Sequence, residues 1–289
     1  MSTQPIDGGR SGDAASTGGV NRVGSTSLAR EWQRFTPGQR IGRWLVWLGM
    51  VAACVWAIRS IDIIPEFLAD APEQMADLLV RMWPPNLAHY YPTVHGALVE
   101  TIHIATLGTL MSLGLALPVA LLAARNVCRS RVLNTLAQLI LVSSRTVNSL
   151  VWALIFVAVF GPGPAAGTFA IAFRSIGFVG KLLAEAMEEA APGPLEALRA
   201  TGAPWGSVML KGLWPQVQPA FWGVALFRWD INLRESAVLG LVGAGGIGVV
   251  LDDAINFFHW DRVATILLAI LVVVLLAEVV VTRIRTKLL

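Results

Sequence analysis

Charged residues are scarce in this sequence. Asp, Glu, Lys and Arg make up only 14% of the 289 residues, and 55% of the residues are hydrophobic, whereas about 25% charged residues are usual in a soluble domain. This composition excludes an ordinary soluble globular domain and indicates an integral membrane protein. The net charge of +3 is small. No basic cluster alternates with aromatic residues, which argues against nucleic acid as a partner.

Several chemical signatures are also missing. The two cysteines, Cys54 and Cys128, have neither disulfide nor metal-site spacing, so we expect packing residues and no bound metal. The phosphate-binding sequence G-x-x-x-x-G-K-[ST] does not occur, so the chain is not expected to hydrolyse ATP or to hold a cofactor itself. The motifs of zinc proteases and serine hydrolases are absent, which argues against a membrane enzyme.

Composition divides the chain into two regions. Residues 1–40 begin with a Gly-, Ser-, Thr- and Asp-rich stretch that is too polar to form a core, and we expect a disordered cytoplasmic tail rather than a secretory signal. Residues 41–289 are the expected transmembrane domain, an all-α, polytopic helical bundle. Six apolar stretches are long enough to cross a membrane as helices: Trp44–Ile64, Gly96–Ala123, Val132–Phe160, Ala165–Ala184, Gln216–Leu241 and Val263–Thr282.

Interruptions within and between these spans are also predicted. Pro118 should kink the second span, and the third should tilt or break near Ser143–Arg145. Gly161–Pro164 favours a tight external turn. Apolar residues from Pro72 to Trp83 recur at helical spacing, which predicts a helix lying on the outer membrane surface.

Positive charges are distributed unevenly between the segments that join the spans. Fifteen Lys and Arg residues fall in the segments that six spans would place inside, and three fall outside: Arg59, Arg81 and Arg262. The positive-inside rule therefore predicts that both termini are cytoplasmic. It also places the loop of about residues 185–215 on the cytoplasmic side.

This cytoplasmic loop carries signals for two short helices. Gly193-Pro194 would begin the first, Thr201-Gly202 would end it, and Pro204 would begin the second. The result would be a compact helical element outside the bilayer, joined to the next span by Pro215. Its polar side chains would be free to contact a partner.

The spacing of the loop resembles the EAA loop of ABC importer permeases, E-A-A-x3-G-x9-I-x-L-P, which docks on the ATPase subunit. Four positions match the pattern: Glu196, Ala197, Gly202 and Pro215. Three depart from it: Leu198, Gly212 and Trp214. The resemblance, together with the polar side chain of Arg199, assigns ATPase coupling to Glu196, Ala197, Arg199, Gly202 and Pro215.

Further stretches resemble the permeases of bacterial phosphonate ABC importers, the PhnE family of MetI-like, binding-protein-dependent permeases. They include Ser175–Lys181 and Val238–Gly248, and the likeness extends from about Pro65 to the C-terminus. The sequence departs from the family at Arg174, where a His or a small polar residue is expected, and at Asn148. These departures leave open whether the substrate is a phosphonate, phosphate or a related oxyanion.

The resemblance implies a type I ABC importer permease, a multi-pass protein of the cell membrane surrounded by lipid. It implies a second copy of the chain, two copies of a separate ATPase that binds ATP and Mg²⁺, and an extracytoplasmic phosphonate- or phosphate-binding protein. ATP-driven closure of the ATPase dimer would move the 185–215 loops and rock the spans around a central pathway.

Arginines within the predicted spans are candidates for that pathway. A charge inside a membrane helix costs at least about 2.5 kcal/mol on insertion scales, so it faces protein or a water-filled path. The planar guanidinium group suits bidentate contacts with a tetrahedral oxyanion. The candidate pathway residues are Arg145, Arg174, Ser175, Arg228, Asn232, Arg234 and Ser236.

The same charges have a structural interpretation. Asp230 could pair with Arg234 four residues later, and Glu235 with Arg228, without either pair touching substrate. Arg145 could extend its side chain to the inner interface.

The segment Gly243–Gly248 matches G-x-G-x-x-G but lacks a βαβ context, which excludes a dinucleotide site. We interpret Gly243, Gly245, Gly246 and Gly248 as an outer gate, where flexible backbone and exposed N–H groups could meet an anion. Close packing of helices is the alternative.

Glu100 and His103 share one face of the second span. A proton relay through them would suit the alternative function, an ion-coupled secondary transporter of a small anion. A contact that holds helices together at the outer mouth is the structural interpretation. A secondary transporter is expected to have inverted repeats with broken helices in both halves, which the sequence does not contain.

Overall fold

The computed structural model describes residues 37–60 and 65–288, and these residues form helices and connecting turns without a strand. The chain divides into two compact units, residues 1–67 and 68–289. In the first unit, α1 spans Pro37–Ser60, and residues 40–60 are exposed throughout. The first span was expected to run to Ile64, but the helix ends at Ser60 and residues 61–64 lie outside the described part. The expected tail also falls almost entirely outside it.

The second unit contains the remaining helices. They are α2 (Pro65–Met82, which begins in the first unit), η1 (Leu87–His89), η2 (Tyr90–Val94), α3 (His95–Ala123), α4 (Arg131–Thr146), α5 (Ser149–Phe160), α6 (Pro164–Glu188), α7 (Pro192–Ala200), α8 (Trp205–Ser207), η3 (Val208–Leu213), α9 (Trp214–Leu239), η4 (Gly240–Val242), α10 (Ile247–Asn256) and α11 (Trp260–Leu288).

Membrane spans can be recognised by helix length and composition. Four stretches are long and apolar enough: Arg40–Ser60, Leu87–Ala123, Pro164–Glu188 and Trp260–Lys287. Two further stretches qualify as bent pairs, Arg131–Thr146 with Ser149–Phe160, bent by 93°, and Trp205–Val242 with Ile247–Asn256, bent by 44°. The described residues thus provide up to six spans when each bent pair counts as one, in agreement with the six expected.

The bend in the third span lies slightly later than predicted. It falls at Val147 and Asn148 rather than at Ser143–Arg145, because Val147 adopts an extended conformation (ψ 132°) and Asn148 caps the next helix. The Asn148 side chain accepts a hydrogen bond from the main-chain N–H of Leu150 at 3.1 Å. Asn is among the preferred residues at this position, so the bend is encoded by the residue at which the sequence departs from the family pattern.

Two other predictions concerning helix ends have different outcomes. The expected turn at Gly161–Pro164 is present, with positive φ at Gly161 (84°) and Gly163 (147°) and a helix that begins at Pro164. The helix expected to begin at Pro72 instead begins at Pro65 and continues through Pro72. Proline removes one main-chain hydrogen bond, but its fixed φ is helical, so the helix continues here. The apolar residues Met75 and Leu79 on α2 are exposed.

Helix α6 lies at the centre of the second unit and packs against α3, α4, α5 and α9. Glycines allow these close approaches. A Cβ atom at Gly108 of α3 would lie 2.7 Å from Cγ2 of Ile171 on α6, and one at Gly177 of α6 would overlap the main-chain oxygen of Leu141 on α4. The helices that carry the polar residues of the predicted pathway are therefore held at short separations.

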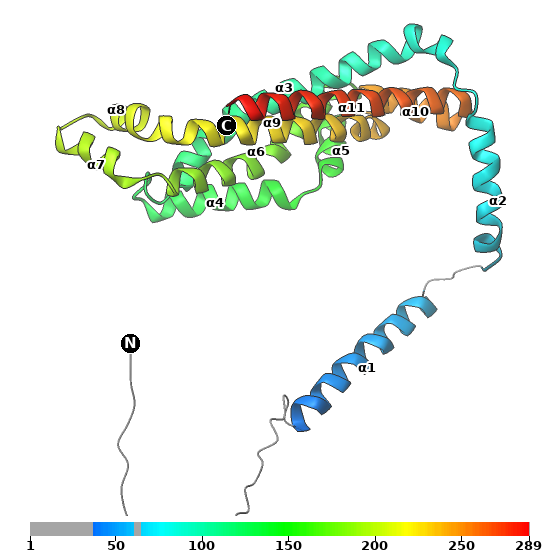
Figure 1. Ribbon diagram of the computed structural model, residues 1–289, viewed down its shortest axis with the longest axis horizontal. Helices are drawn as coiled ribbons and strands as arrows, with labels where there is room; N and C mark the ends of the chain where they lie inside the picture. The colour runs from blue at the N-terminus through cyan, green and yellow to red at the C-terminus, as the bar shows by residue number, and fades with distance from the viewer. Residues whose placement is uncertain (1–36, 61–64, 289) are drawn as a thin grey trace, which may run out of the picture. The chain divides into compact units, whose positions relative to one another are not determined.

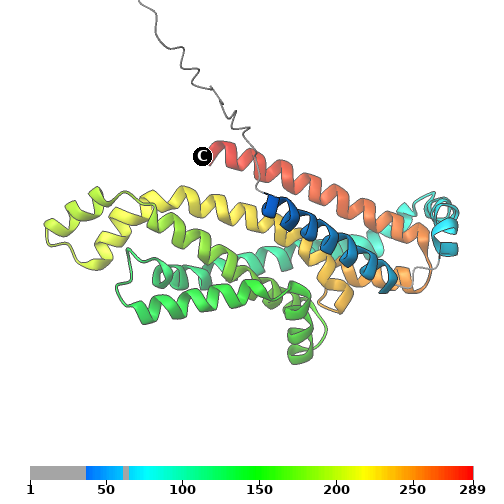
Figure 2. The same ribbon diagram turned by 90° about the horizontal axis from the view of Figure 1, so that it is seen from below.

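Different helices lie at the two ends of the bundle. Figures 1 and 2 place α7 and α8 at one end and α10 at the other. Helices α3 and α6 run toward the α7 end, and α4 and α9 run back from it. The connection 124–130 between α3 and α4, which contains Arg125 and Arg129, therefore lies at the same end as α7.

Candidate functional site

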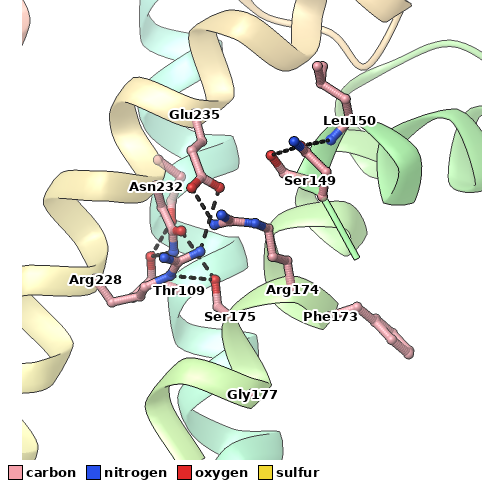
Figure 3. Close-up of polar contacts among 12 residues, drawn as sticks. Thr109, Ser149, Leu150, Phe173, Arg174, Ser175, Gly177, Arg228, Asn232 and Glu235 are labelled. Carbon is pink, nitrogen blue, oxygen red and sulfur yellow. Dashed lines mark hydrogen bonds and ion pairs between the residues drawn. The ribbon is translucent and has the colours of Figure 1, made fainter. Parts of the chain in front are cut away.

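A polar cluster lies inside the bundle where α3, α6 and α9 meet (Figure 3). We call it the Arg228 cluster; its members are Thr109, Arg174, Ser175, Arg228, Asn232 and Glu235. The Arg228 side chain is only 4% exposed, and its Nε donates to Ser175 Oγ at 2.9 Å. Ser175 Oγ donates to Asn232 Oδ1 at 3.2 Å, and Asn232 Nδ2 donates to Thr109 Oγ1 at 2.8 Å. One chain of hydrogen bonds thus joins three helices.

Glu235 lies between two guanidinium groups of this cluster. Its Oε1 accepts a charge-assisted hydrogen bond from Arg174 Nη1, and its Oε2 is 3.5 Å from Arg228 Nη2. Glu235 and Arg174 remain 18% and 29% exposed, so one side of the cluster is open. The guanidinium carbon of Arg228 also lies 5.6 Å from the centre of the Phe178 ring, within range of a cation–π contact. Two cations share one carboxylate, which leaves the group with a net positive charge.

Four of the seven predicted pathway residues are therefore brought together: Arg174, Ser175, Arg228 and Asn232. The pairing of Glu235 with Arg228 predicted by the structural interpretation is present. That Glu235 also pairs with Arg174 was not predicted. Arg174 and Glu235 are 61 residues apart, and no periodicity in the sequence links two positions on different helices.

Arg234 and Ser236 lie in other surroundings. Arg234 pairs with Asp230 on the same helix, as the structural interpretation predicted, and is half exposed. The Ser236 hydroxyl is 1% exposed and is placed to donate to the main-chain oxygens of Leu233, at 2.8 Å, and Thr101, at 3.3 Å. Its contacts therefore lie between α9 and α3 rather than in the Arg228 cluster.

Arg145 is also separate from the cluster. It is exposed and lines a groove of about 370 Å³ at the α7 end of the bundle, between α4 and α6. Arg125 and Lys181 add positive charge to the groove, and Glu185, which is 3.5 Å from Lys181, adds negative charge.

The glycine segment, Gly243–Gly248, is hydrogen-bonded to side chains of the protein itself. The N–H of Gly246 donates to Glu100 Oε1 at 3.0 Å, and the N–H of Ile247 donates to Thr101 Oγ1 at 2.7 Å. Two N–H groups at the start of α10 are thus already paired, so an anion could reach them only by displacing α3 side chains. Gly248 packs directly on Gly240, as the close-packing alternative predicted.

Glu100 consequently has a different partner from the one expected. It binds the glycine segment, 146 residues away in the sequence, whereas His103 is exposed. The carboxylate holds α3 against the start of α10, which agrees with a role in joining helices. The Gly163 N–H donates to the Gly243 carbonyl at 2.9 Å and fixes the same segment to the α5–α6 turn.

The predicted coupling loop forms the expected pair of short helices. Helix α7 begins at Pro192, one residue before the expected Gly193, and Gly202 follows it with a φ of 76°. Leu195 is buried against η3, and a Cβ at Gly212 would lie 3.0 Å from Leu198 Cδ1. The two departures from the EAA pattern at these positions therefore compensate each other, because Leu198 fills the space beside Gly212.

The predicted coupling residues lie at the surface of the loop. All five are exposed: Glu196, Ala197, Arg199, Gly202 and Pro215. Gln216 was not predicted from the sequence but holds the base of the loop. Its Oε1 accepts from the Ala191 N–H at 2.9 Å, and its Nε2 donates to the Gly212 carbonyl at 2.8 Å. Among the described residues, no three His, Cys, Asp or Glu side chains gather closely enough to hold a metal ion.

Comparison with known families and sequences adds to this geometry. Residues 116–289 match the family described as binding-protein-dependent transport system inner membrane component. The chain is 35% identical over 240 residues to the phosphite transport system permease protein PtxC of Stutzerimonas stutzeri, covering 83% of this chain and 86% of PtxC. It is 37% identical over 239 residues to the phosphate-import permease protein PhnE of Mycolicibacterium smegmatis, covering 83% of this chain and 45% of that protein.

Solved structures resemble the fold. The inward-facing MetNI methionine ABC transporter aligns with a TM-score of 0.59 and 21% identity, over 68% of this chain and 96% of that one. An amino acid ABC transporter crystallised with histidines aligns with a TM-score of 0.58 and 19% identity, over 70% of this chain and 96% of that one. The expected type I ABC importer permease fold is thereby confirmed.

Proposed function

Because the chain belongs to the family of binding-protein-dependent transport system inner membrane components, and is thus the membrane permease of an ABC importer, we propose that it carries a phosphorus oxyanion inward. Phosphonate, phosphite and phosphate share a tetrahedral, anionic group, and relatives named for phosphite and phosphate are 35% and 37% identical to this chain. Importers of any of these substrates need a path that tolerates negative charge inside the membrane.

The Arg228 cluster is the observation that carries the proposal. It contains two guanidinium groups against one carboxylate, inside helices that qualify as spans. Buried charges are costly unless paired, so a surplus cation in the middle of a bundle is best explained by an anion that visits it. Ser175 and Asn232 add neutral hydrogen-bonding groups on the same helices.

We propose that α7 is where a separate ATPase docks. Its outward side chains, Glu196 and Arg199, are exposed at one end of the bundle, while Leu195 anchors the helix to η3. A push on α7 would therefore pass through η3 into α9, which carries Arg228 and Glu235. Since one chain has one such loop, two copies of the chain would match two copies of the ATPase, which binds ATP and Mg²⁺. The chain itself is a transport subunit rather than an enzyme.

The proposed orientation puts α7, the Arg125–Arg131 connection and both termini in the cytoplasm, with residues 1–40 as a cytoplasmic tail. The other end, with α10 and the Gly161–Pro164 turn, would then face an extracytoplasmic binding protein. Gly243, Gly245, Gly246 and Gly248 would lie at that mouth, in a segment that Glu100 holds in place. A gate there would open by releasing the bond between Glu100 and Gly246.

Reconstitution tests the proposed function. The chain, a candidate ATPase and a candidate binding protein would be placed in lipid vesicles, and uptake of radiolabelled phosphate, phosphite and methylphosphonate would be measured. We expect uptake of at least one of them that requires ATP and the binding protein. Uptake that proceeds without ATP and is abolished by a protonophore would instead support the ion-coupled secondary transporter. ATP-driven uptake of none of the three would contradict the substrate class.

A further inference from the structure

A groove lies at the α7 end of the bundle, where α3 meets α8, η3 and α9. It consists of two adjoining hollows of about 220 Å³ and 510 Å³, and Leu121 of α3 and Trp205 of α8 line both of them. We call it the Trp205 groove. The Trp205 side chain is 61% exposed. A large exposed indole at the end of a membrane bundle is typical of the interface between membrane and water.

The two hollows differ in chemistry. The smaller one is lined by apolar side chains, among them Leu210 and Trp214. The larger one also contains Arg129 and Ser130 of the connection between α3 and α4. Among the described residues that line either hollow, none is acidic. The groove therefore combines a purely apolar part with a part that carries one positive charge.

The Arg129 side chain is available to a ligand. It is exposed, and within the described part of the chain no carboxylate forms an ion pair with it. Arg125 belongs to the same connection but lines the separate groove between α4 and α6, together with Glu185 and Glu188. The Trp205 groove is thus complementary to a molecule that has a negative charge and an apolar part.

We propose that the Trp205 groove binds an anionic phospholipid, with its acyl chains in the apolar hollow and its phosphate group at Arg129. Helix α1 and a second copy of the chain are the other candidates for this surface. In the proposed orientation, the first turns of α1, with Arg40 and Arg43, lie on the same side of the membrane as Arg129. A second copy has the same arginines on that side. Either one would bring positive charge toward Arg129, whereas a phospholipid brings negative charge.

Charge rather than chain length should determine which lipid is bound. An acyl chain leaves an apolar bilayer to enter an apolar groove, so this contact provides a fit but little net preference. One arginine near the membrane surface attracts an anionic lipid by about 1 kcal/mol, which corresponds to about a fivefold preference. We therefore expect phosphatidylglycerol to be bound about fivefold more than phosphatidylcholine with the same acyl chains. This expectation does not depend on which substrate the protein transports.

Photo-crosslinking from inside the groove tests the proposal. Leu122 lines the larger hollow and is 40% exposed, so p-benzoylphenylalanine at this position would react with the molecule that occupies the groove. The full chain with this label would be placed in nanodiscs that contain equal amounts of phosphatidylglycerol and phosphatidylcholine. Mass spectrometry would identify the adducts, and we expect those with phosphatidylglycerol to be about fivefold more abundant.

Arg129→Gln and Arg125→Gln form a matched pair in the labelled chain. Both substitutions remove one exposed positive charge from the same connection, but only Arg129 lines the Trp205 groove. Arg129→Gln should bring the two lipid adducts to equal yield, whereas Arg125→Gln should keep a preference of about fivefold. Since both side chains are exposed, thermal unfolding should give the same Tm for both variants and the parent.

Four results would overturn the proposal. Equal adducts with Arg129 intact, or an unchanged ratio in Arg129→Gln, would show that Arg129 does not recognise the lipid. The same loss of preference in Arg125→Gln would show that the general charge of this end attracts the lipid. Adducts with protein only, or no adducts, would show that no lipid occupies the groove. Loss of the preference in excess inorganic phosphate, but not in chloride at the same ionic strength, would show that the site takes a free oxyanion.

Discussion

Replacing Gly177 by Ala tests how closely α6 packs on α4. A Cβ at this position would overlap the main-chain oxygen of Leu141 and would lie 2.9 Å from the main-chain nitrogen of Arg145. Both neighbours are backbone atoms of α4, so the two helices would have to separate by about 1 Å to restore ordinary van der Waals distances. The separation would also strain the bond from the Gly177 N–H to Ser144 Oγ, which is 3.2 Å long.

The size of the effect follows from two opposing contributions. Overpacking costs about 1–3 kcal/mol, and contact with backbone places Gly177→Ala at the upper end. Replacing Gly by Ala inside a helix favours folding by about 1 kcal/mol. The net loss is therefore about 2 kcal/mol, which corresponds to a fall in Tm of about 4–8 °C for a protein of this size class.

Two other glycines on α3 and α6 provide a graded control. A Cβ at Gly180 would lie 2.5 Å from Leu141 Cδ2, the mobile end of a side chain, and a Cβ at Gly114 would meet nothing within 4 Å. Thermal unfolding in detergent should therefore rank the variants as Gly177→Ala lowest, Gly180→Ala near the wild type and Gly114→Ala equal to or above it. Equal Tm values for all three variants would refute the packing described here.

Two further substitutions test the ends of the bundle. Glu196→Ala should reduce co-purification of the ATPase or its stimulation by substrate. Because the side chain is exposed, we expect the free energy of unfolding to change by less than about 0.5 kcal/mol, so that Tm stays close to the wild-type value. Unchanged assembly and unchanged transport would count against docking at α7. Gly245→Ala should destabilise the protein more than Gly243→Ala in thermal unfolding. Both residues have φ near 80°, a conformation that costs Ala about 1–2 kcal/mol. Only at Gly245 would the added Cβ also meet Pro164 N, at 2.7 Å, and Glu100 Oε1, at 2.8 Å. Equal losses would mean that the contact with Glu100 contributes nothing.

Local features of the fold could be predicted from the sequence. Apolar runs, prolines and glycines act over a few residues, and they located the six spans, the turn at Gly161–Pro164 and the two short helices around α7. The pair Asp230–Arg234 was predictable because residues four apart share a helix face. Where a local signal was weak, as at Pro72, the predicted boundary was wrong.

Contacts between helices could not be predicted in the same way. The bond from Gly246 to Glu100 and the bond from Arg174 to Glu235 join residues 146 and 61 positions apart. They depend on which faces of α3, α6, α9 and α10 meet, and helical periodicity identifies a polar face without identifying its partner. The sequence accordingly named Arg174 and Arg228 as candidates but not the carboxylate that they share.

The most direct test of the central claim measures oxyanion uptake through variants of the Arg228 cluster. In vesicles with the ATPase and the binding protein, Arg228→Gln should reduce the maximal rate of ATP-driven uptake of the transported oxyanion at least about tenfold, the effect of losing about 1.4 kcal/mol of interaction with the passing anion. Arg174→Gln, at a more exposed position, provides a second variant if Arg228→Gln does not assemble. Arg285→Gln, an exposed arginine near the end of α11, should transport at the wild-type rate. Wild-type uptake by assembled complexes of both Arg228→Gln and Arg174→Gln would contradict the assignment of this cluster to the substrate pathway.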